Sequence, residues 1–311
     1  MSTAYRITTP IPTLHDYAQP VTALSFDPVS DTLWSGTNAG TVIALHTVQG
    51  LRGVSFPVGG ALAVKQIVAG DNNVRALGVA GEGVGSWAKG GMNKWFYRYV
   101  SPLVLHLYIL LSSYRSSSTL TAFSSTTYTS NVLAASTTAP ELVLLNAMTG
   151  NPVRVASSSS VATHLQFSHS TLLAASADGY VRVHDPRTGL LRENGENSVL
   201  AHTSGVQDLQ ASGNYFYTVG WSIRCVTDKL CIGVLLMCCR RGHDFPDPLV
   251  KVYDLRTMRP LPPIPFQDGP AFINILPKHT SSLVVTSTQG LVNVVDVSDH
   301  SNASGFYQVC Q

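Results

Sequence analysis

Hydrophobic and polar residues alternate in short runs along most of the chain, with the period of two that is typical of β-strands. Residues 181–185 and 250–254 place valine at every second position and end in Asp, and the valine-rich run 291–296 also ends in Asp. Gly, Pro, Asn and Asp bound these runs, as expected for turns between strands. The pattern predicts an all-β chain.

The runs recur at a regular spacing. A small or turn-forming residue opens each of six segments: Gly40, Gly81, Pro140, Gly179, Pro248 and Gly290. Six positions later stand His46, Trp87, Asn146, Asp185, Asp254 and Asp296. The steps between openings are 41, 59, 39, 69 and 42 residues, and three of these match the period of about 40 residues of a four-stranded propeller blade. Because one such sheet cannot bury both of its faces alone, the units must stack, which predicts a β-propeller.

The repeat also sets the expected domain organisation. Residues 1–20 form an N-terminal segment, residues 21–308 form the propeller, and residues 309–311 are a truncated end. Six blades can be counted, near residues 21–50, 62–91, 119–153, 162–191, 206–260 and 270–300. Asp185, Asp254 and Asp296 stand where WD40 repeats end their third strand, although the Trp-Asp dipeptide is absent. The pattern resembles the WD40 type, and we expect a propeller of seven blades of which six are visible.

Composition excludes several classes of function. Charged residues make up 12% of the chain and the formal net charge is +2, too little to indicate nucleic acid as the main partner. The apolar runs 103–111 and 230–239 are far shorter than the roughly 20 residues that a membrane helix needs. Residues 1–20 lack the basic and apolar regions of a signal peptide, so we expect an intracellular protein with no membrane partner.

Candidate catalytic and metal-binding residues are missing from the sequence. The five cysteines, at 225, 231, 238, 239 and 310, follow no spacing known for zinc ligands. Two-metal nucleases need clustered carboxylates, whereas Asp185, Asp254 and Asp296 are separated by whole blades and are better explained as turn caps. The sequence therefore predicts no catalytic residue, no metal and no cofactor, and this chain is not expected to be an enzyme.

Aromatic and basic residues alternate in one segment that could contact RNA or a partner. Bases stack on aromatic rings and phosphates attract cations, and both residue types are present at Trp87, Lys89, Lys94, Trp95 and Arg98. Blade cores also use aromatic residues, which gives these tryptophans an alternative, purely structural role.

Three segments closely resemble a particular family. Residues 21–40, 50–95 and 245–277 are similar to the N-terminal WD40 domain of the fungal catalytic subunit of the poly(A)-binding-protein-dependent poly(A) ribonuclease, and the resemblance covers most of residues 21–308. It implies a seven-bladed propeller, followed by a linker, an inactive ubiquitin-hydrolase-like domain and a nuclease domain that uses four acidic residues and two metal ions. On this resemblance, everything catalytic is expected beyond the end of the present chain.

The resemblance implies a non-catalytic interaction platform in an mRNA poly(A)-tail shortening (deadenylation) complex. Such a propeller binds the adaptor subunit, reaches poly(A)-binding protein and poly(A) RNA indirectly, and works in the cytoplasm and its mRNA processing bodies. A first alternative is that the chain is the front end of a mispredicted full-length poly(A)-specific 3′–5′ exoribonuclease. A second is an unrelated WD40 scaffold.

Residues 99–117 and 225–243 are anomalous inserts within the two overlong steps. Similar sequences pass almost directly from residues like 95–98 to residues like 118–123, and from residues like 220–224 to residues like 245–248. One hypothesis is that both inserts are retained introns translated in frame, and that a third intron supplies residues 309–311. The alternative is a genuine surface insertion, because loops between strands tolerate added length at small cost.

Overall fold

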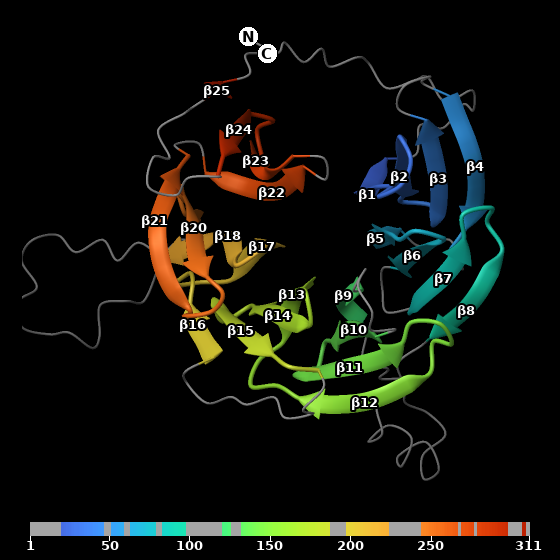
Figure 1. The fold of residues 1–311 in the computed structure, drawn as a ribbon, viewed down its shortest axis with the longest axis horizontal. Helices are drawn as coiled ribbons and strands as arrows, with labels where there is room; N and C mark the ends of the chain where they lie inside the picture. Colours follow the sequence, from blue (N-terminus) through green and yellow to red (C-terminus); the bar gives the residue numbers. More distant parts are fainter. Residues whose placement is uncertain are drawn as a thin grey trace, which may run out of the picture. The chain divides into compact units, whose positions relative to one another are not determined.

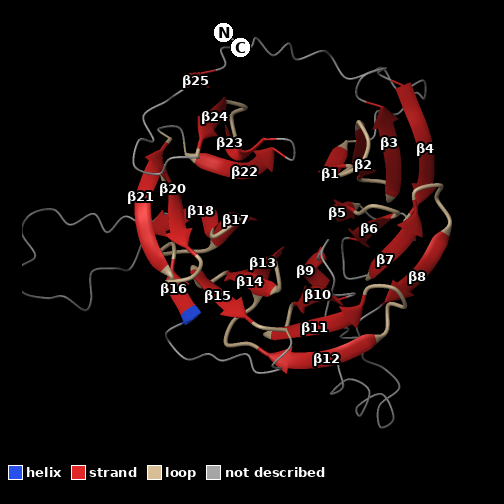
Figure 2. Ribbon diagram, viewed as in Figure 1, coloured by secondary structure: helices blue, strands red, loops and turns tan. Residues whose placement is uncertain are grey.

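The computed structural model describes residues 20–46, 51–58, 63–78, 83–97, 120–125, 132–186, 197–223, 244–266, 269–276, 279–297 and 307–308. The described elements are almost all β-strands (Figure 2). They form six antiparallel sheets, numbered here in chain order and coloured from blue to red in Figure 1. The expectation of an all-β chain with six repeated sheets is confirmed.

Sheets 1 to 3 follow the simplest possible topology, in which each strand pairs with the next along the chain. Sheet 1 contains β1 (Val21–Phe26), β2 (Thr32–Thr37), β3 (Thr41–His46) and β4 (Leu51–Pro57). Sheet 2 contains β5 (Val64–Ala69), β6 (Asn73–Gly78), β7 (Val84–Ala88) and β8 (Asn93–Tyr97). Sheet 3 contains β9 (Leu120–Ser125), β10 (Val132–Thr137), β11 (Glu141–Asn146) and β12 (Pro152–Ser157).

Sheets 4 to 6 repeat this order, with one added strand in sheet 5. Sheet 4 contains β13 (Ala162–Ser168), β14 (Thr171–Ser176), β15 (Tyr180–His184) and β16 (Ser198–Leu200). Sheet 5 contains β17 (Val206–Ser212), β18 (Tyr215–Ile223), β19 (Asp244–Pro246), β20 (Leu249–Asp254) and β21 (Arg259–Pro265). Sheet 6 contains β22 (Pro270–Leu276), β23 (His279–Ser287), β24 (Val292–Asp296) and β25 (Tyr307–Gln308).

The chain divides into two compact units. The first comprises residues 1–172 and 185–191, and the second comprises residues 173–184 and 192–311. In the first unit, Trp34, Phe56 and Trp87 lie in a core formed by sheets 1 and 2, and Leu77, Phe123 and Leu145 lie in a core formed by sheets 2 and 3. In the second unit, the cores contain residues such as Phe216 and Leu283.

Burial differs between the middle and the outer strands, which explains their composition. The middle strands β6 and β10 are buried along most of their length, whereas the outer strands β12 and β21 are mostly exposed. A strand covered on both faces needs small and apolar residues at successive positions, and this requirement accounts for runs such as residues 132–135.

Three of the six segment openings have a common backbone conformation. Gly40, Gly179 and Gly290 have φ values of 75°, 83° and 87°, a region that favours glycine because it has no Cβ. Each glycine N–H donates to the carbonyl three residues earlier, at distances of 3.2, 3.1 and 3.2 Å. The regular spacing in the sequence therefore records a tight turn before the third strand of the sheet.

The two anomalous inserts lie outside the described residues, but the flanks of the second are informative. β18 extends to Ile223 and pairs with β19, with Ile223 opposite Asp244 and Trp221 opposite Pro246. The chain thus leaves the sheet and returns to it at neighbouring positions of one antiparallel ladder. Such a hairpin end admits an insert of any length, so it is compatible with both explanations of residues 225–243.

Candidate functional site

The aromatic and basic segment singled out in the sequence lies on the β7–β8 hairpin of sheet 2. Trp87 is 3% exposed and stacks on Phe56, with ring centroids 5.9 Å apart and ring planes 28° apart. Trp95 is 8% exposed, and its Nε1 donates a hydrogen bond of 3.1 Å to the carbonyl oxygen of Ala147. Both rings are parts of the core, which corresponds to the structural alternative for these residues.

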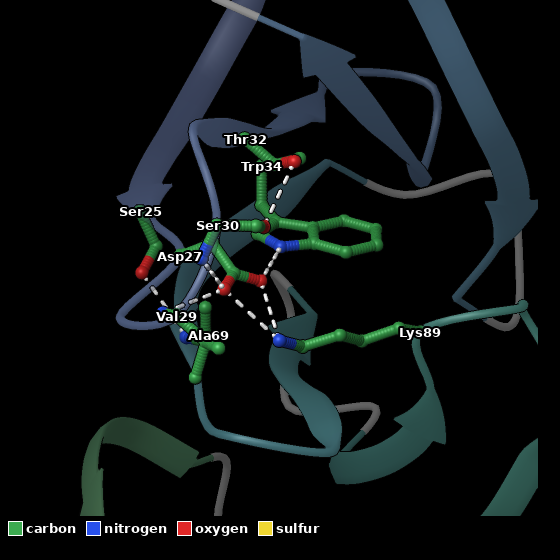
Figure 3. A network of polar contacts seen from close by, with 8 residues as sticks. All are labelled: Ser25, Asp27, Val29, Ser30, Thr32, Trp34, Ala69 and Lys89. Carbon is green, nitrogen blue, oxygen red and sulfur yellow. Dashed lines mark hydrogen bonds and ion pairs between the residues drawn. The ribbon is translucent and has the colours of Figure 1, made fainter.

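Lys89 is held by a polar network that joins sheets 1 and 2 (Figure 3). Its Nζ lies 2.7 Å from Oδ2 and 2.9 Å from Oδ1 of Asp27, whose side chain is fully buried. Oδ2 also accepts from Trp34 Nε1 at 3.0 Å, and Oδ1 accepts from the N–H groups of Val29 and Ser30, both at 2.9 Å. One carboxylate therefore fixes the β1–β2 turn and binds a cation from the next sheet.

The environment keeps Asp27 ionised. Burial by itself would raise the pKa of this carboxyl, but the hydrogen bonds from Lys89, Trp34 and the two N–H groups hold the pKa well below its ordinary value. Hydrogen bonds to a charged form favour that form. The role that the contacts give to Lys89 is a structural ion pair.

The outer side of the same hairpin faces solvent. Lys94 is exposed, Phe96 is 39% exposed and Met92 is 69% exposed, while Arg98 lies outside the described residues. Contact of this segment with RNA or a partner remains a prediction, and Lys94 and Phe96 expose more of their side chains to solvent than the two tryptophans.

A recurring device connects the first strands of successive sheets. Ser25 Oγ accepts from Ala69 N at 3.0 Å, Ser124 Oγ accepts from Phe167 N at 3.1 Å, and Asp208 Oδ2 accepts from Ile273 N at 3.0 Å. The side-chain amide of Gln66 bonds both the N–H and the carbonyl of Phe123. Each bond satisfies a backbone group on the unpaired edge of the first strand of the following sheet. Without such a bond, that edge could pair with strands of other molecules.

Sheet 5 contains a second buried polar cluster, which the sequence did not suggest. Asp247 Oδ2 contacts His202 Nδ1 at 3.3 Å, Ser222 Oγ at 2.9 Å and Lys251 Nζ at 3.0 Å. His202 Nε2 lies 3.1 Å from Thr218 Oγ1. His202 and Asp247 are 45 positions apart, with the insert between them, so no local motif indicated the pair.

Electrostatics assign the protons in this cluster. Burial lowers the pKa of His202, more strongly than the bond to Asp247 raises it, so the imidazole is neutral at pH 7. Burial would raise the pKa of Asp247, but bonds from His202, Lys251 and Ser222 hold it well below its ordinary value. An ionised carboxylate can only accept, so Nδ1 of His202 donates to Asp247 and Nε2 accepts from Thr218. The cluster stabilises the sheet through satisfied hydrogen bonds.

The turn-cap explanation of the acidic residues is confirmed at Asp254. Its Oδ1 accepts from Arg256 N at 2.8 Å, and Asn146 Oδ1 similarly accepts from Met148 N at 2.9 Å. Within the described ranges, no group of three or more His, Cys, Asp or Glu residues is arranged to hold a metal ion. In the same ranges, no helix has the length and apolar character needed to cross a membrane.

Comparison with a solved structure defines the class of protein. The WD40 domain of Pan2 from Neurospora crassa superposes with a TM-score of 0.70 at 23% identity, over 94% of this chain and 81% of that domain. A computationally designed protein, Ika8, superposes with a TM-score of 0.58 at 20% identity. The fold is a WD40-type β-propeller, as the sequence predicted.

The family follows from the sequence matches. A family model described as PAN2 N-terminal matches residues 12–311, and the chain belongs to this family. The PAN2-PAN3 deadenylation complex catalytic subunit PAN2 of Cryptococcus neoformans is 33% identical over 96% of this chain and 23% of its own length. The Schizosaccharomyces pombe counterpart is 33% identical over 42% of this chain and 10% of its own length.

These matches delimit what the chain contains. It spans about a quarter of the length of the Cryptococcus relative, 23%, and corresponds to the N-terminal WD40 propeller domain rather than to a nuclease domain. The resemblance seen in residues 21–40, 50–95 and 245–277 is thus confirmed, and this chain is not the catalytic part of the family.

Proposed function

We propose that this propeller is a non-catalytic interaction platform of an mRNA deadenylation complex, and that it binds a PAN3-type adaptor subunit. The match of residues 12–311 to the PAN2 N-terminal family carries the proposal, because the related subunits are named for a PAN2-PAN3 complex. The polar clusters of sheets 1, 2 and 5 support it, since their side chains bond to other parts of the propeller. Because these clusters have a structural role, we assign partner binding to exposed residues of the surface.

The outer side of the β7–β8 hairpin is the proposed contact surface. It presents the exposed Met92 in the turn before β8, and the exposed Lys94 and Phe96 on β8, whose other side is anchored by Trp95. Aromatic residues and methionine are enriched in the centres of protein interfaces, and a rigid support lowers the entropy lost on binding. Poly(A)-binding protein and poly(A) RNA are reached through the adaptor, in the cytoplasm and its processing bodies.

Binding to the PAN3-type subunit of the same organism tests the proposal. We expect the chain to bind this subunit in calorimetry, and the double variant Lys94→Glu/Phe96→Ala to lose about tenfold or more in affinity, as interface anchors do. Arg259→Glu, an exposed change on β21 of the other unit, is the matched control and keeps the affinity. If the wild-type chain does not bind the subunit, the platform role is wrong; if it binds but the double variant binds equally well, the contact surface is wrong.

A further inference from the structure

Arg75 is a buried cation on the middle strand of sheet 2. It is 7% exposed and stands opposite Val68 of β5 and Ser86 of β7. Its neighbours Val74 and Ala76 belong to the core shared with sheet 1, whereas Leu77 belongs to the core shared with sheet 3. Because side chains alternate along a strand, Arg75 shares the face of Leu77, toward sheet 3.

Two buried polar atoms of this position are unsatisfied. Within the described part of the chain, Arg75 Nε and Ser86 Oγ are buried without a hydrogen-bond partner, and Arg75 forms none of the ion pairs found there. Ser86 is 0% exposed, and residues directly opposite on paired strands have Cβ atoms about 5 Å apart. A buried guanidinium without an anion is costly, and such groups are normally paired.

Sheet 1 shows what the site in sheet 2 lacks. Trp34 and Arg75 occupy the same register position, opposite Ser25 and Val68 respectively, one pair inside the β-turn. In sheet 1, the turn residue Asp27 accepts from Trp34 and from Lys89 of the next sheet. Its counterpart in sheet 2 is Gly70, since Gly70 N donates to Asn73 O as Asp27 N donates to Thr32 O. The donor is therefore present in sheet 2, but no carboxylate stands at the corresponding turn position among the described residues.

No described residue of the neighbouring chain supplies that carboxylate, and Glu82 lies outside the described residues. Gly70 has no side chain, so the position that carries the acid in sheet 1 carries none in sheet 2; a Cβ built there would lie 2.7 Å from Asn73 Oδ1. The nearest acid in the described sequence, Asp71, is exposed and forms no ion pair with Arg75. Residues 98–119 and 126–131, which flank β9, contain neither Asp nor Glu.

We propose that Arg75 and Ser86 form a binding subsite for the carboxylate of an Asp or Glu side chain from a partner polypeptide. The guanidinium offers two parallel N–H donors to a carboxylate, and the Ser86 hydroxyl adds a third donor. Trp95 of β8 stands opposite Ser86, so Arg75, Ser86 and Trp95 are successive neighbours across the sheet. The exposed Met92 and Met148 lie in the turns beside Trp95 and its acceptor Ala147. An acidic residue next to an apolar one matches this arrangement.

A protein segment fits better than RNA. A single carboxylate side chain is slender enough to reach a group that is 7% exposed, whereas a backbone phosphate is flanked by two riboses. The net charge of +2 also provides no field that would favour a polyanion. The subsite does not depend on the identity of the adaptor, and it stands even if a PAN3-type subunit does not bind.

The test uses the 311-residue chain and a short peptide probe. N-acetyl-Leu-Glu-Leu-amide is added to wild type, to Arg75→Met and to the control Arg154→Met on the exposed β12, with the Gln peptide as the neutral comparison. We expect the Glu peptide to raise the Tm of wild type and control by about 2 °C or more, and the Gln peptide to have no effect. Arg75→Met melts at a higher temperature without peptide, because it lacks an unpaired charge, and does not respond.

Several results would overturn the proposal. They are no response of wild type to the Glu peptide, an equal response of Arg75→Met, or a response to oligo(A) RNA that Arg75→Met loses. A loss of stability in Asp71→Asn or Glu82→Gln that vanishes in the Arg75→Met background would identify an internal counterion instead. Should Arg75→Met fail to fold, the ¹⁵N shift of the Arg75 Nε–H in wild type decides, because only a bound carboxylate moves it with the Glu peptide and not with the Gln peptide.

Discussion

Single buried carboxylates act as joints in this propeller. The one carboxylate of Asp27 accepts hydrogen bonds from a side chain of its own sheet, from its own turn and from Lys89 of the next sheet. The pair of Asp178 and Arg182 has the same 2.7 Å separation, but the side chain of Asp178 is 35% exposed. Equal distances therefore correspond to different energies, because water screens the carboxylate of Asp178 but not the fully buried carboxylate of Asp27.

We expect Asp27→Asn to lower the free energy of unfolding by about 2 kcal/mol, since the amide leaves a charged Lys89 and the Trp34 N–H poorly paired. The matched variant Asp178→Asn changes it by no more than about 0.5 kcal/mol. Urea unfolding of the two variants measures both values. A loss in Asp27→Asn as small as that in Asp178→Asn would mean that the network does not join the sheets.

Asp208 makes the folded protein less stable as pH rises. Burial raises its pKa to about 7, more than the N–H groups of Ile273 and Leu209 lower it. The folded state therefore holds a proton that the unfolded state has already released above its ordinary pKa of 3.8, and stability is lost as pH rises from about 4 through about 7. Asp27 and Asp247 have lowered pKa values, so their contribution is instead lost as pH falls below about 4.

The measurement is the free energy of urea unfolding across pH 4 to 8 in wild type and in Asp208→Asn. Between about pH 4 and pH 7, the free energy of unfolding should fall more steeply with pH in wild type than in the variant. The difference in slope should correspond to one bound proton. Identical slopes would show that Asp208 titrates near its unfolded value. Arg256→Ala, which removes an exposed partner of the Asp254 turn cap, controls for general charge effects and keeps the wild-type slope.

At the level of elements, the sequence predicted what is recorded locally and missed what is assembled from distant residues. Gly40, Gly179 and Gly290 could be found because each turn needs a positive φ at a fixed place in the repeat. The burial of Trp87 and Trp95 could not, because alternation does not tell whether neighbouring sheets cover both faces of the hairpin. The cluster of His202 and Asp247 was hidden for a different reason, since the insert between them breaks the repeat.

The paired ends of β18 and β19 make the second insert removable. We expect deletion of residues 225–243, with a Gly-Gly turn joining Arg224 to Asp244, to preserve folding, because Ile223 and Asp244 already face each other in the ladder. Shortening the loop reduces its closure entropy and raises the free energy of unfolding by up to about 2 kcal/mol. Denaturant unfolding measures the change, and Asp247→Ala is the control that loses the neighbouring cluster and is destabilised.

A deletion variant that is destabilised as strongly as Asp247→Ala would show that residues 225–243 contribute contacts of their own and are a genuine part of the fold. The retained-intron hypothesis would then lose its physical support for this segment. A stable variant agrees with both a dispensable insertion and an intron, and the spliced transcript separates those two.

In the molecule as a whole, each of the two units is stabilised by its own buried carboxylate network. The Asp27 network lies in the first unit and the Asp247 cluster in the second. In proteins built from repeated units, stability is approximately a sum of local and nearest-neighbour contributions. We therefore expect Asp27→Asn to increase native-state hydrogen exchange most in residues 20–97, and Asp247→Asn to increase it most in residues 206–266. Exchange mass spectrometry under native conditions reads both regions in one experiment, with Arg256→Ala as a control that changes neither strongly. Equal loss of protection across both units in each variant would mean that the propeller opens only as a whole, and that a joint in one sheet supports every other sheet to the same degree.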